Sequence, residues 1–370
     1  MLVKGLFPPN PRILRLSAFV FKSDRMPVTV NSFAKINLGL RIGAARPDGF
    51  HELRTVYQTI ALHDTIHVQV VRGSGIEIRC ADSRVPKDGT NTCYKVVELA
   101  MATLRSKGRV VIEIEKRLPV QGGLGGASSN AVATLVALER ALKKSLSAAD
   151  KLRIAAEVGS DLPLFLVGGT VLGIGRGEEV CPLPDLPSVQ CVVASPEIGV
   201  STPQAFADWD AMMGAGEAGA EFRSSRTGED TPRSIAYGKL TLPGNSDRMN
   251  KFGRSVASWL SGSTSGVPAG GRGRAETPLL DLVRTGIEND FEKVVFPKYP
   301  ELREVKSLLE RAGAIYASLS GSGSAVYGLF RSQEAARKAA ARLRKAGTPA
   351  QATTTLKRQQ YWKKFLVSRF

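Results

Sequence analysis

A glycine- and serine-rich stretch in the middle of the chain has the composition of a phosphate-binding loop. Residues 118–130 have the sequence LPVQGGLGGASSN and continue into an Ala- and Leu-rich segment that predicts a helix. Glycines let a backbone approach a ligand closely, and the free N–H groups of a helix N-terminus favour an anion. It is not a Walker A loop, because the GxxxxGK[ST] spacing is missing. The alternative is a glycine-rich turn that serves tight packing.

One lysine lies within the first strand-like segment. The segment Val28–Ile42 is rich in β-branched and aliphatic residues and contains the sequence FAKIN. Alternation places Lys35 and Asn37 on one face of this strand, together with Phe33. Burying an ammonium group among apolar residues costs free energy unless the group is paired. Taken alone, Lys35 is therefore expected to lie on an edge strand, where its side chain reaches solvent.

Two further polar motifs could carry chemistry. Asp161 lies in GSDLP, where the following proline disfavours a helix, so we expect it beyond a helix end and ahead of a buried strand, Leu164–Gly173. An aspartate there usually makes an Asx-type turn. The second motif, SLSGSGS at 318–324, predicts either a phosphate-touching loop or a hairpin turn within Tyr316–Phe330. The pair His63 and His67 has no third ligand nearby, so we expect no metal there.

The elements that must position these residues follow from periodicity and turn residues. The predicted strands are Leu53–Leu62, Val110–Lys116, and a hairpin of Thr65–Val71 with Gly75–Cys80, after a turn at Pro47–Gly49. The predicted helices are Asn91–Lys107, Asn130–Leu142, Ser147–Val158 with Ser147 as N-cap, and Pro300–Ala312. Residues 208–277 are rich in Gly, Ser, Thr and Pro, which predicts mostly loop or disorder with a short helix near Met249–Leu260.

Composition narrows the classes of function. A chain of 370 residues with 43% hydrophobic residues is long enough for two domains, and it contains no run of eighteen apolar residues. Four cysteines without CxxC spacing suggest reduced thiols in a cytosolic enzyme. The net charge of +17 is concentrated at the ends, with +10 in residues 331–370 and +4 in residues 1–25. The charge therefore does not predict a nucleic-acid-binding core.

The order of the motifs resembles that of the GHMP kinases, a superfamily named for galactokinase, homoserine kinase, mevalonate kinase and phosphomevalonate kinase. FAKIN, LPVQGGLGGASSN, GSDLP and SLSGSGSAV follow one another as they do there. The turn RPDGFHELR at 46–54 and the lead KRLP at 116–119 are similar to the members that phosphorylate a cytidine diphosphate sugar alcohol in non-mevalonate isoprenoid synthesis. The likeness covers residues 28–206 and 279–330.

The resemblance implies roles for residues at the reacting groups. Lys35 and Asp161 match the catalytic pair, in which the aspartate accepts the proton of the substrate hydroxyl and the lysine pairs with it and with phosphate charge. Asn37 matches a residue that faces the transferring group or a substrate phosphate. This pairing would also resolve the cost of placing Lys35 in an apolar strand.

The resemblance also implies how the two substrates are held. His51 matches a residue that hydrogen-bonds cytosine and Phe50 an aromatic that stacks on it, although many relatives have Tyr there. Gly321, Ser322 and Gly323 match a loop on the substrate side. Gln121 stands where many relatives have Gly or Ala, which leaves the backbone path open. The positions matched to ATP binding are Asn91 and Lys116, near adenine and ribose, and Pro119, Gln121, Gly122, Gly123, Leu124, Gly125, Gly126, Ala127, Ser128 and Ser129. Mg²⁺ is expected with ATP, held by Ser129 with waters and phosphates.

The implied fold class is α+β, a two-domain GHMP kinase fold with the ATP and substrate sites in the cleft between the domains. We expect an N-terminal domain over 26–190, a C-terminal domain over 191–355 with an insertion at about 208–277, and a basic tail over 356–370. Residues 1–25 are an extension, disordered or upstream of a true start at Met26. The expected protein is a monomer or homodimer in bacterial cytoplasm, or alternatively in a plastid, with no nucleic-acid or membrane partner.

Three other hypotheses stay open at this point. Another GHMP kinase, acting on homoserine or mevalonate, would have no use for the DGFH turn, since those substrates carry no base to stack. A binder of nucleic acid or membrane surfaces would act through the basic ends of the chain. A pseudokinase that only binds nucleotide is disfavoured by the presence of both Lys35 and Asp161.

Overall fold

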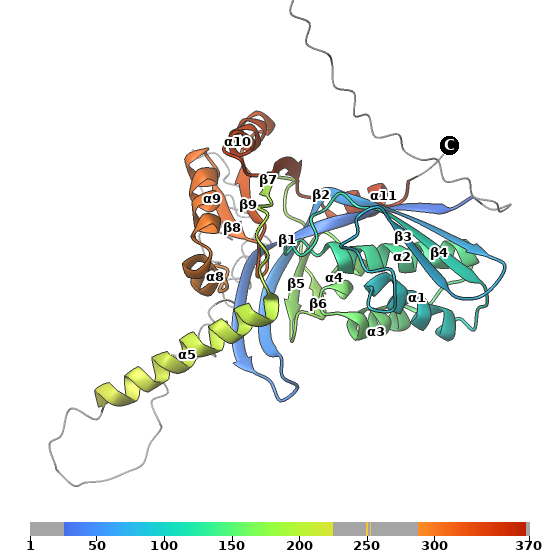
Figure 1. Ribbon diagram of the computed structural model, residues 1–370, viewed down its shortest axis with the longest axis horizontal. Helices are drawn as coiled ribbons and strands as arrows, with labels where there is room; N and C mark the ends of the chain where they lie inside the picture. Colours follow the sequence, from blue (N-terminus) through green and yellow to red (C-terminus); the bar gives the residue numbers. More distant parts are fainter. Residues whose placement is uncertain (1–25, 225–248, 251, 253–287, 368–370) are drawn as a thin grey trace, which may run out of the picture.

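The computed structural model describes residues 26–224, 249, 250, 252 and 288–367 (Figure 1). The predictions for residues 1–25 and most of those for 225–287 concern residues outside these ranges. Within the described ranges, no helix is long and apolar enough to cross a membrane. All four cysteines are free, and burial raises the pKa of Cys93 to about 12.

A six-stranded sheet forms the N-terminal part of the molecule. Its order is β3-β4-β2-β5-β6, with β1 paired to β2. The strands are β1 (Val28–Ala45), β2 (His51–Val71), β3 (Ile76–Cys80), β4 (Arg109–Glu115), β5 (Thr170–Ile174) and β6 (Glu179–Pro182). One face is covered by α1 (Thr92–Thr103), α2 (Gly126–Leu142), α3 (Ala148–Val158), α4 (Leu162–Val167) and α11 (Arg358–Phe365). Buried aliphatic and aromatic side chains from both layers form the first core.

A four-stranded sheet of order β10-β7-β9-β8 forms the C-terminal part. Its strands are β7 (Gln190–Ala194), β8 (Tyr316–Leu319), β9 (Val326–Phe330) and β10 (Ala350–Thr354). The helices packed with it are α5 (Thr202–Ser224), α8 (Glu292–Lys298), α9 (Pro300–Arg311) and α10 (Gln333–Lys345). A further core lies between the two sheets, where apolar residues of β1 and β2 meet those of β7 and β9. The layers confirm the predicted α+β fold class.

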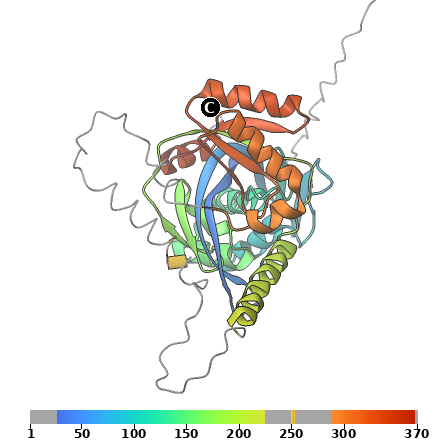
Figure 2. The same ribbon diagram turned by 90° about the vertical axis from the view of Figure 1, so that its left-hand side faces the viewer.

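The long strand β1 connects the three cores. Phe33 packs in the first core, Ile36 between the sheets, and Ile42 in the core of the C-terminal part. Figure 2 shows β1 and β2, in blue, running through the middle of the molecule. Strands β1 and β2 therefore form a ribbon to which both parts of the molecule are attached.

Three predicted elements differ in the structure. The strand Ile76–Cys80 forms no hairpin with β2; it pairs in parallel with β4, and helix α1 connects the two strands. The prediction failed because alternation identifies a strand but not its partner. The predicted strand Leu164–Gly173 begins as helix α4, since Pro163 occupies the first turn, where its missing N–H is not needed. The segment predicted as loop from residue 208 is helical as far as Ser224, in α5.

The C-terminal tail also differs from expectation, because α11 folds back onto the N-terminal part. Tyr361 and Phe365 are buried in the first core, and the indole N–H of Trp362 donates to the carbonyl of Val167. Lys363 and Lys364 are exposed on the outer face of this helix, whereas the guanidinium of Arg358 is partly buried and donates to the carbonyls of Thr170 and Leu183, each at 3.1 Å.

Two glycine loops, one from each part of the chain, meet at the centre of the molecule. The hydroxyl of Ser320 donates to the carbonyl of Gly123 at 2.9 Å, and the amide of Ala325 donates to that of Gly122 at 3.1 Å. Gly123 has a φ of 72°, and a Cβ atom added there would overlap the carbonyl oxygen of Ser320. Only glycine permits both this backbone conformation and this approach.

We expect Gly123→Ala to lower the free energy of unfolding by about 2–4 kcal/mol, from left-handed strain and overpacking together. Denaturant unfolding measures this, with Gly89→Ala as the control. Gly89 has an ordinary φ and no neighbour closer than 4.0 Å to its added Cβ, so its change should be within about 0.5 kcal/mol. Equal losses in the two variants would contradict the proposed close contact.

Candidate active site

The glycine stretch opens helix α2 with its amide groups available. The helix begins at Gly126, and the preceding Gly125 has a φ of 69° and provides no side-chain cap. The first turn of a helix leaves N–H groups without intrahelical partners, and the helix dipole adds positive potential there. Gln121 has a φ of 60°, so the loop keeps a left-handed turn at the position where a glycine is more common. The backbone at the start of α2 therefore has the conformation that the sequence predicted for an anion-binding loop.

The predicted pair Lys35 and Asp161 is brought together. Lys35 Nζ lies 3.5 Å from Asp161 Oδ2 and donates to Asn37 Oδ1 at 2.7 Å, and its residue is only 3% exposed. Asn37 in turn donates to the hydroxyl of Thr55 at 2.8 Å. Burial lowers the pKa of Lys35, while the Asp161 charge acts in the opposite direction. The lysine is thus a buried, paired cation rather than an edge-strand lysine in solvent.

Asp161 stands at the start of a helix, not ahead of a strand. It precedes the short helix α4, and its side chain is 33% exposed. The hydroxyl of Tyr57, on the central strand β2, donates to Asp161 Oδ1 at 2.9 Å. The two oxygens of the carboxylate therefore have different partners, Lys35 and Tyr57, and Tyr57 was not expected from the sequence.

A cavity of about 370 Å³ opens beside this pair and contains the residues predicted for substrate binding. Lys35, Asn37, Phe50, His51, Gly321 and Ser322 all contribute to its wall, and so do Asp161 and Tyr57. Of the residues predicted for substrate binding, Gly323 is absent from this wall, and its amide donates to the carbonyl of Ser320 at 3.0 Å. The cavity is closed on one side by the glycines and Ser128 of the loop.

His51 is held by helix α5, which the sequence did not predict. Its imidazole is stacked on Phe206, with ring centroids 4.9 Å apart and planes 11° apart. Its Nε2 lies 2.7 Å from Asp210 Oδ1, and since a carboxylate only accepts, Nε2 carries the hydrogen. Phe50 is 50% exposed at the rim, with the guanidinium of Arg176 4.9 Å from its ring centre. Two aromatic rings and an imidazole thus gather at one end of the cavity.

A second cavity, of about 360 Å³, lies on the other side of the glycine loop. We call it the nucleotide-side cavity, because the residues predicted to bind ATP line it. Apolar side chains of Val85, Pro86 and Ile114 contribute to it, as do the predicted nucleotide residues Asn91 and Lys116. The Asn91 side chain is occupied, because it caps α1 through the amide of Cys93 and donates to the carbonyl of Pro86. It therefore shapes this cavity and has little freedom to reach a ligand.

Lys116 is fixed by a buried carboxylate that the sequence did not reveal. Lys116 Nζ lies 2.6 Å from Asp64 Oδ2, and Asp64 Oδ1 accepts from the amides of Arg117 and Leu118, each at 2.7 Å. Asp64 is fully buried, and these three partners of its carboxylate belong to the segment that leads into the glycine loop. This carboxylate therefore sets the path of that segment.

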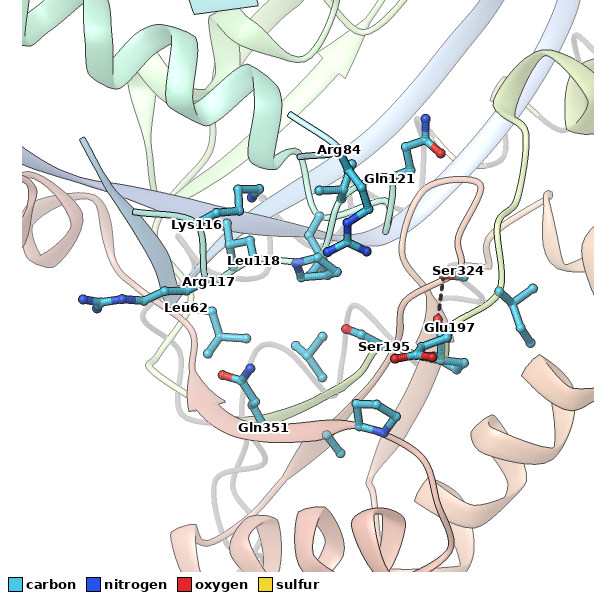
Figure 3. Close-up of a pocket in the computed structure, with 18 of the residues that line it drawn as sticks. Leu62, Arg84, Lys116, Arg117, Leu118, Gln121, Ser195, Glu197, Ser324 and Gln351 are labelled. Atoms are coloured by element: carbon cyan, nitrogen blue, oxygen red, sulfur yellow. Dashed lines mark hydrogen bonds between the residues drawn. The ribbon is translucent and has the colours of Figure 1, made fainter. Parts of the chain in front are cut away.

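The nucleotide-side cavity continues into a larger one of about 800 Å³ between the two parts of the molecule. Figure 3 shows Arg84 from one side and Glu197 from the other extending into this space, with Ser195 and Gln351 along its lower wall. Lys116 and Gln121 also line it. The cleft between the sheets is thus open beside the glycine loop.

The two serines of the loop have different positions. Ser129 is buried, and its hydroxyl donates to the carbonyl of Phe33 at 2.6 Å and accepts from Ser32 at 2.7 Å. Ser128 lines both cavities. The geometry therefore favours Ser128, and not Ser129 as we expected, as the hydroxyl that a phosphate-bound metal ion could meet. The remaining loop residues, including Pro119, Leu124 and Ala127, line the nucleotide-side cavity.

Comparison with known proteins identifies the class. Residues 91–169 match the family model of the GHMP kinases N terminal domain, and residues 276–348 that of the GHMP kinases C terminal. A homoserine kinase from Cytophaga hutchinsonii shares the fold, with a TM-score of 0.63 at 22% identity over 92% of this chain and 98% of that one. The fold and these matches define a small-molecule kinase of the GHMP superfamily that uses ATP as phosphoryl donor.

Closer relatives define the family within that class. A 4-diphosphocytidyl-2-C-methyl-D-erythritol kinase from Solibacter usitatus is 36% identical over 83% of this chain and 82% of its own length, and one from Desulfitobacterium hafniense is 32% identical over 90% and 98%. A crystal structure of 4-(cytidine 5'-diphospho)-2C-methyl-D-erythritol kinase matches at 29% identity with a TM-score of 0.62, over 88% of this chain and 98% of that one. The chain belongs to the 4-diphosphocytidyl-2-C-methyl-D-erythritol kinase family.

The role of Asp64 yields a prediction. Asp64→Asn should lower the free energy of unfolding by about 3 kcal/mol or more and raise the KM for ATP, because it leaves the buried Lys116 ammonium without its counter-charge. Denaturant unfolding and initial-rate kinetics measure the two effects.

The matched control is Glu115→Gln, on the neighbouring strand end. Glu115 forms only partly exposed ion pairs with His67 and Arg117, so its loss should cost less than about 1 kcal/mol. An Asp64 variant as stable as this control would show that the buried carboxylate does not fix the lead into the loop.

Proposed function

We propose that the enzyme transfers the γ-phosphoryl group of ATP to the 2-hydroxyl of 4-diphosphocytidyl-2-C-methyl-D-erythritol, giving the 2-phosphate and ADP in the methylerythritol phosphate pathway. The observation that carries this proposal is the shared wall of the two cavities. Gly123, Gly125 and Ser128 line both, and the pair Lys35 and Asp161 stands at the wall of one of them. A donor in one cavity and an acceptor in the other would meet at the glycine loop.

Asp161 acts as the general base in this proposal. Asp161 lines the cavity and its Oδ2 pairs with Lys35, so a substrate hydroxyl bound there could pass its proton to the carboxylate as the oxygen attacks phosphorus. The bond between the γ-phosphorus and its bridging oxygen breaks, and the electron pair leaves on ADP. Lys35 and the amide groups at the start of α2 lie where they can stabilise the charge on the transferring group. Asn37 keeps the ammonium in place through its side-chain oxygen.

The aromatic end of the substrate cavity suits a pyrimidine base. Phe50 lines this end and offers a ring for stacking, which is worth about 1–3 kcal/mol per base, while Phe206 is stacked on His51. In the neutral tautomer whose Nε2–H donates to Asp210, the other ring nitrogen of His51 is an acceptor, and the exocyclic amine of cytosine is a donor. This arrangement supports cytidine as the nucleoside.

The residues at the loop fit a magnesium ion held mainly by phosphate and water oxygens. Among the described residues, no group of three His, Cys, Asp or Glu side chains could hold a metal ion by itself, and Mg²⁺ commonly binds nucleotide phosphates while keeping several waters. Ser128 is the hydroxyl that would meet such an ion. When bound, the ion would neutralise phosphate charge.

We also propose a bacterial cytoplasmic enzyme, monomeric or homodimeric, with a plastid as the alternative location. The named relatives are bacterial. The proposed domains are 26–190 and 191–355, and the start of β7 at Gln190, the first strand of the second sheet, supports that boundary. Helix α11 then returns the chain to the N-terminal domain.

Asp161→Asn should reduce kcat by about 10²–10⁴-fold, because the amide cannot accept the proton, and should change the KM for ATP little. The assay measures ADP release with and without the cytidyl substrate. The control variant is Asp150→Asn, in the first turn of α3. A variant that keeps a tenth of the parent kcat would exclude Asp161 as the base. Turnover of homoserine or mevalonate in place of the cytidyl substrate would overturn the substrate assignment and leave the class intact.

Phe206→Leu should raise the KM for the cytidyl substrate about tenfold or more while the KM for ATP stays within twofold, because His51, the proposed hydrogen-bonding partner of the base, loses the ring on which it is stacked. Initial rates at varied concentrations of each substrate separate the two constants. An equal rise in both would mean that the variant disturbs α5 as a whole.

A further inference from the structure

We propose that Tyr57 is a positioning residue for phosphoryl transfer, whose hydroxyl donates to one oxygen of Asp161 and leaves the other directed at Lys35 and the substrate cavity. The inference rests on the proposed role of Asp161 as base. Tyr57 Oη lies 2.9 Å from Asp161 Oδ1, while Lys35 Nζ lies 3.5 Å from Oδ2. The two partners thus divide the two oxygens between them.

The backbone of Tyr57 is fixed on both sides. It pairs with Asn37 of β1 and with Val171 of β5, so its strand is in the interior of the sheet. The side chain is buried, and Lys35 Nζ lies 5.6 Å from the centre of its ring. A donor on a central strand holds its position better than one on a loop, which is what a positioning role requires.

Two glycines leave the space that the phenol occupies. A Cβ atom on Gly173 would lie 2.5 Å from Cε2 of Tyr57, and one on Gly177 would lie 2.6 Å from its hydroxyl oxygen. Gly177 has a φ of 104°, which disfavours other residues independently. The surroundings therefore accommodate the hydroxyl itself and not only the ring.

Asp161 needs such a partner. It stands at the start of the six-residue helix α4, its side chain makes no cap hydrogen bond, and it is only partly buried. Among the described residues, its side chain contacts Tyr57 and Lys35, and the contact with the lysine is the longer one. Burial, and next the charge of Asp161, raises the pKa of Tyr57 well above its usual value, so the phenol stays protonated and remains a donor at neutral pH.

The chemical consequence falls on kcat. The phenol holds the carboxylate through Oδ1, which leaves Oδ2, paired with Lys35, as the oxygen proposed to receive the substrate proton. The phenol would therefore orient the base without competing for the proton. This effect does not change how ATP is held, since Tyr57 does not line the nucleotide-side cavity.

The test compares Tyr57→Phe with Tyr361→Phe. The control residue is also a buried tyrosine of the first core, and its hydroxyl donates to the carbonyl of Phe165 at 2.8 Å, on the helix-covered side of the sheet. We expect Tyr57→Phe to lower kcat about tenfold or more and to leave both KM values within twofold, because only the orientation of the base changes. Tyr361→Phe should lose at least as much thermal stability and keep the parent kcat.

A double-mutant cycle shows whether Tyr57 acts through Asp161. In single-turnover assays with excess enzyme, Tyr57→Phe should lower the rate of the parent but not the residual rate of Asp161→Asn. A Tyr57→Phe enzyme within twofold of the parent kcat, or an equal loss in both backgrounds, would overturn the inference while leaving Asp161 as base. An active Asp161→Asn enzyme would overturn the base assignment, and this inference with it.

Discussion

The buried ammonium of Lys35 is the constraint around which the active site is arranged. A cation in the middle of an apolar strand is tolerated only with an opposite charge and hydrogen bonds close to it. Asn37 supplies one acceptor from the same strand, and Asp161 supplies the charge from the start of α4. The same contacts that compensate for burial place the proposed base, Asp161, beside the glycine loop. Stability and chemistry therefore depend here on one small cluster.

This arrangement also explains how a phosphate loop can work without the lysine of a Walker A sequence. In this chain, cations reach the loop from outside it: Lys35 from β1 and Lys116 from the segment held by Asp64. The loop itself contributes backbone amides and close contact, and it is braced by the second glycine loop through Gly123 and Ser320. Because the two loops belong to different parts of the chain, the contacts that brace the glycine loop require the two parts to be packed together, as they are at the cleft.

Local sequence was sufficient for the motifs and insufficient for their partners. Lys35, Asp161 and the glycine stretch could be identified because their types and order are visible in the chain. Asp161 lies beyond the end of α3, as predicted, but a helix and not a strand follows it. Tyr57, Asp64 and Asp210 could not be identified, since each acts through a contact with a distant segment. Neither alternation nor composition specifies which strand is central or which serine of a pair turns inward. The role of α5 was missed because a segment rich in small residues was taken for a loop.

The site is divided between a rigid and a peripheral part. Lys35, Asn37 and Tyr57 stand on paired strands of the central sheet, where their backbones are fixed by neighbours. Phe50 lies at the rim, and Phe206 reaches the cavity from α5. GHMP kinases act on substrates as different as homoserine and mevalonate, so the fold cannot by itself select the acceptor. Selection must fall to the peripheral residues, because the central ones cannot change without exposing or unpairing the buried lysine. A change of substrate is therefore compatible with this fold only where the base-binding end is altered and the Lys35–Asp161–Tyr57 cluster is kept.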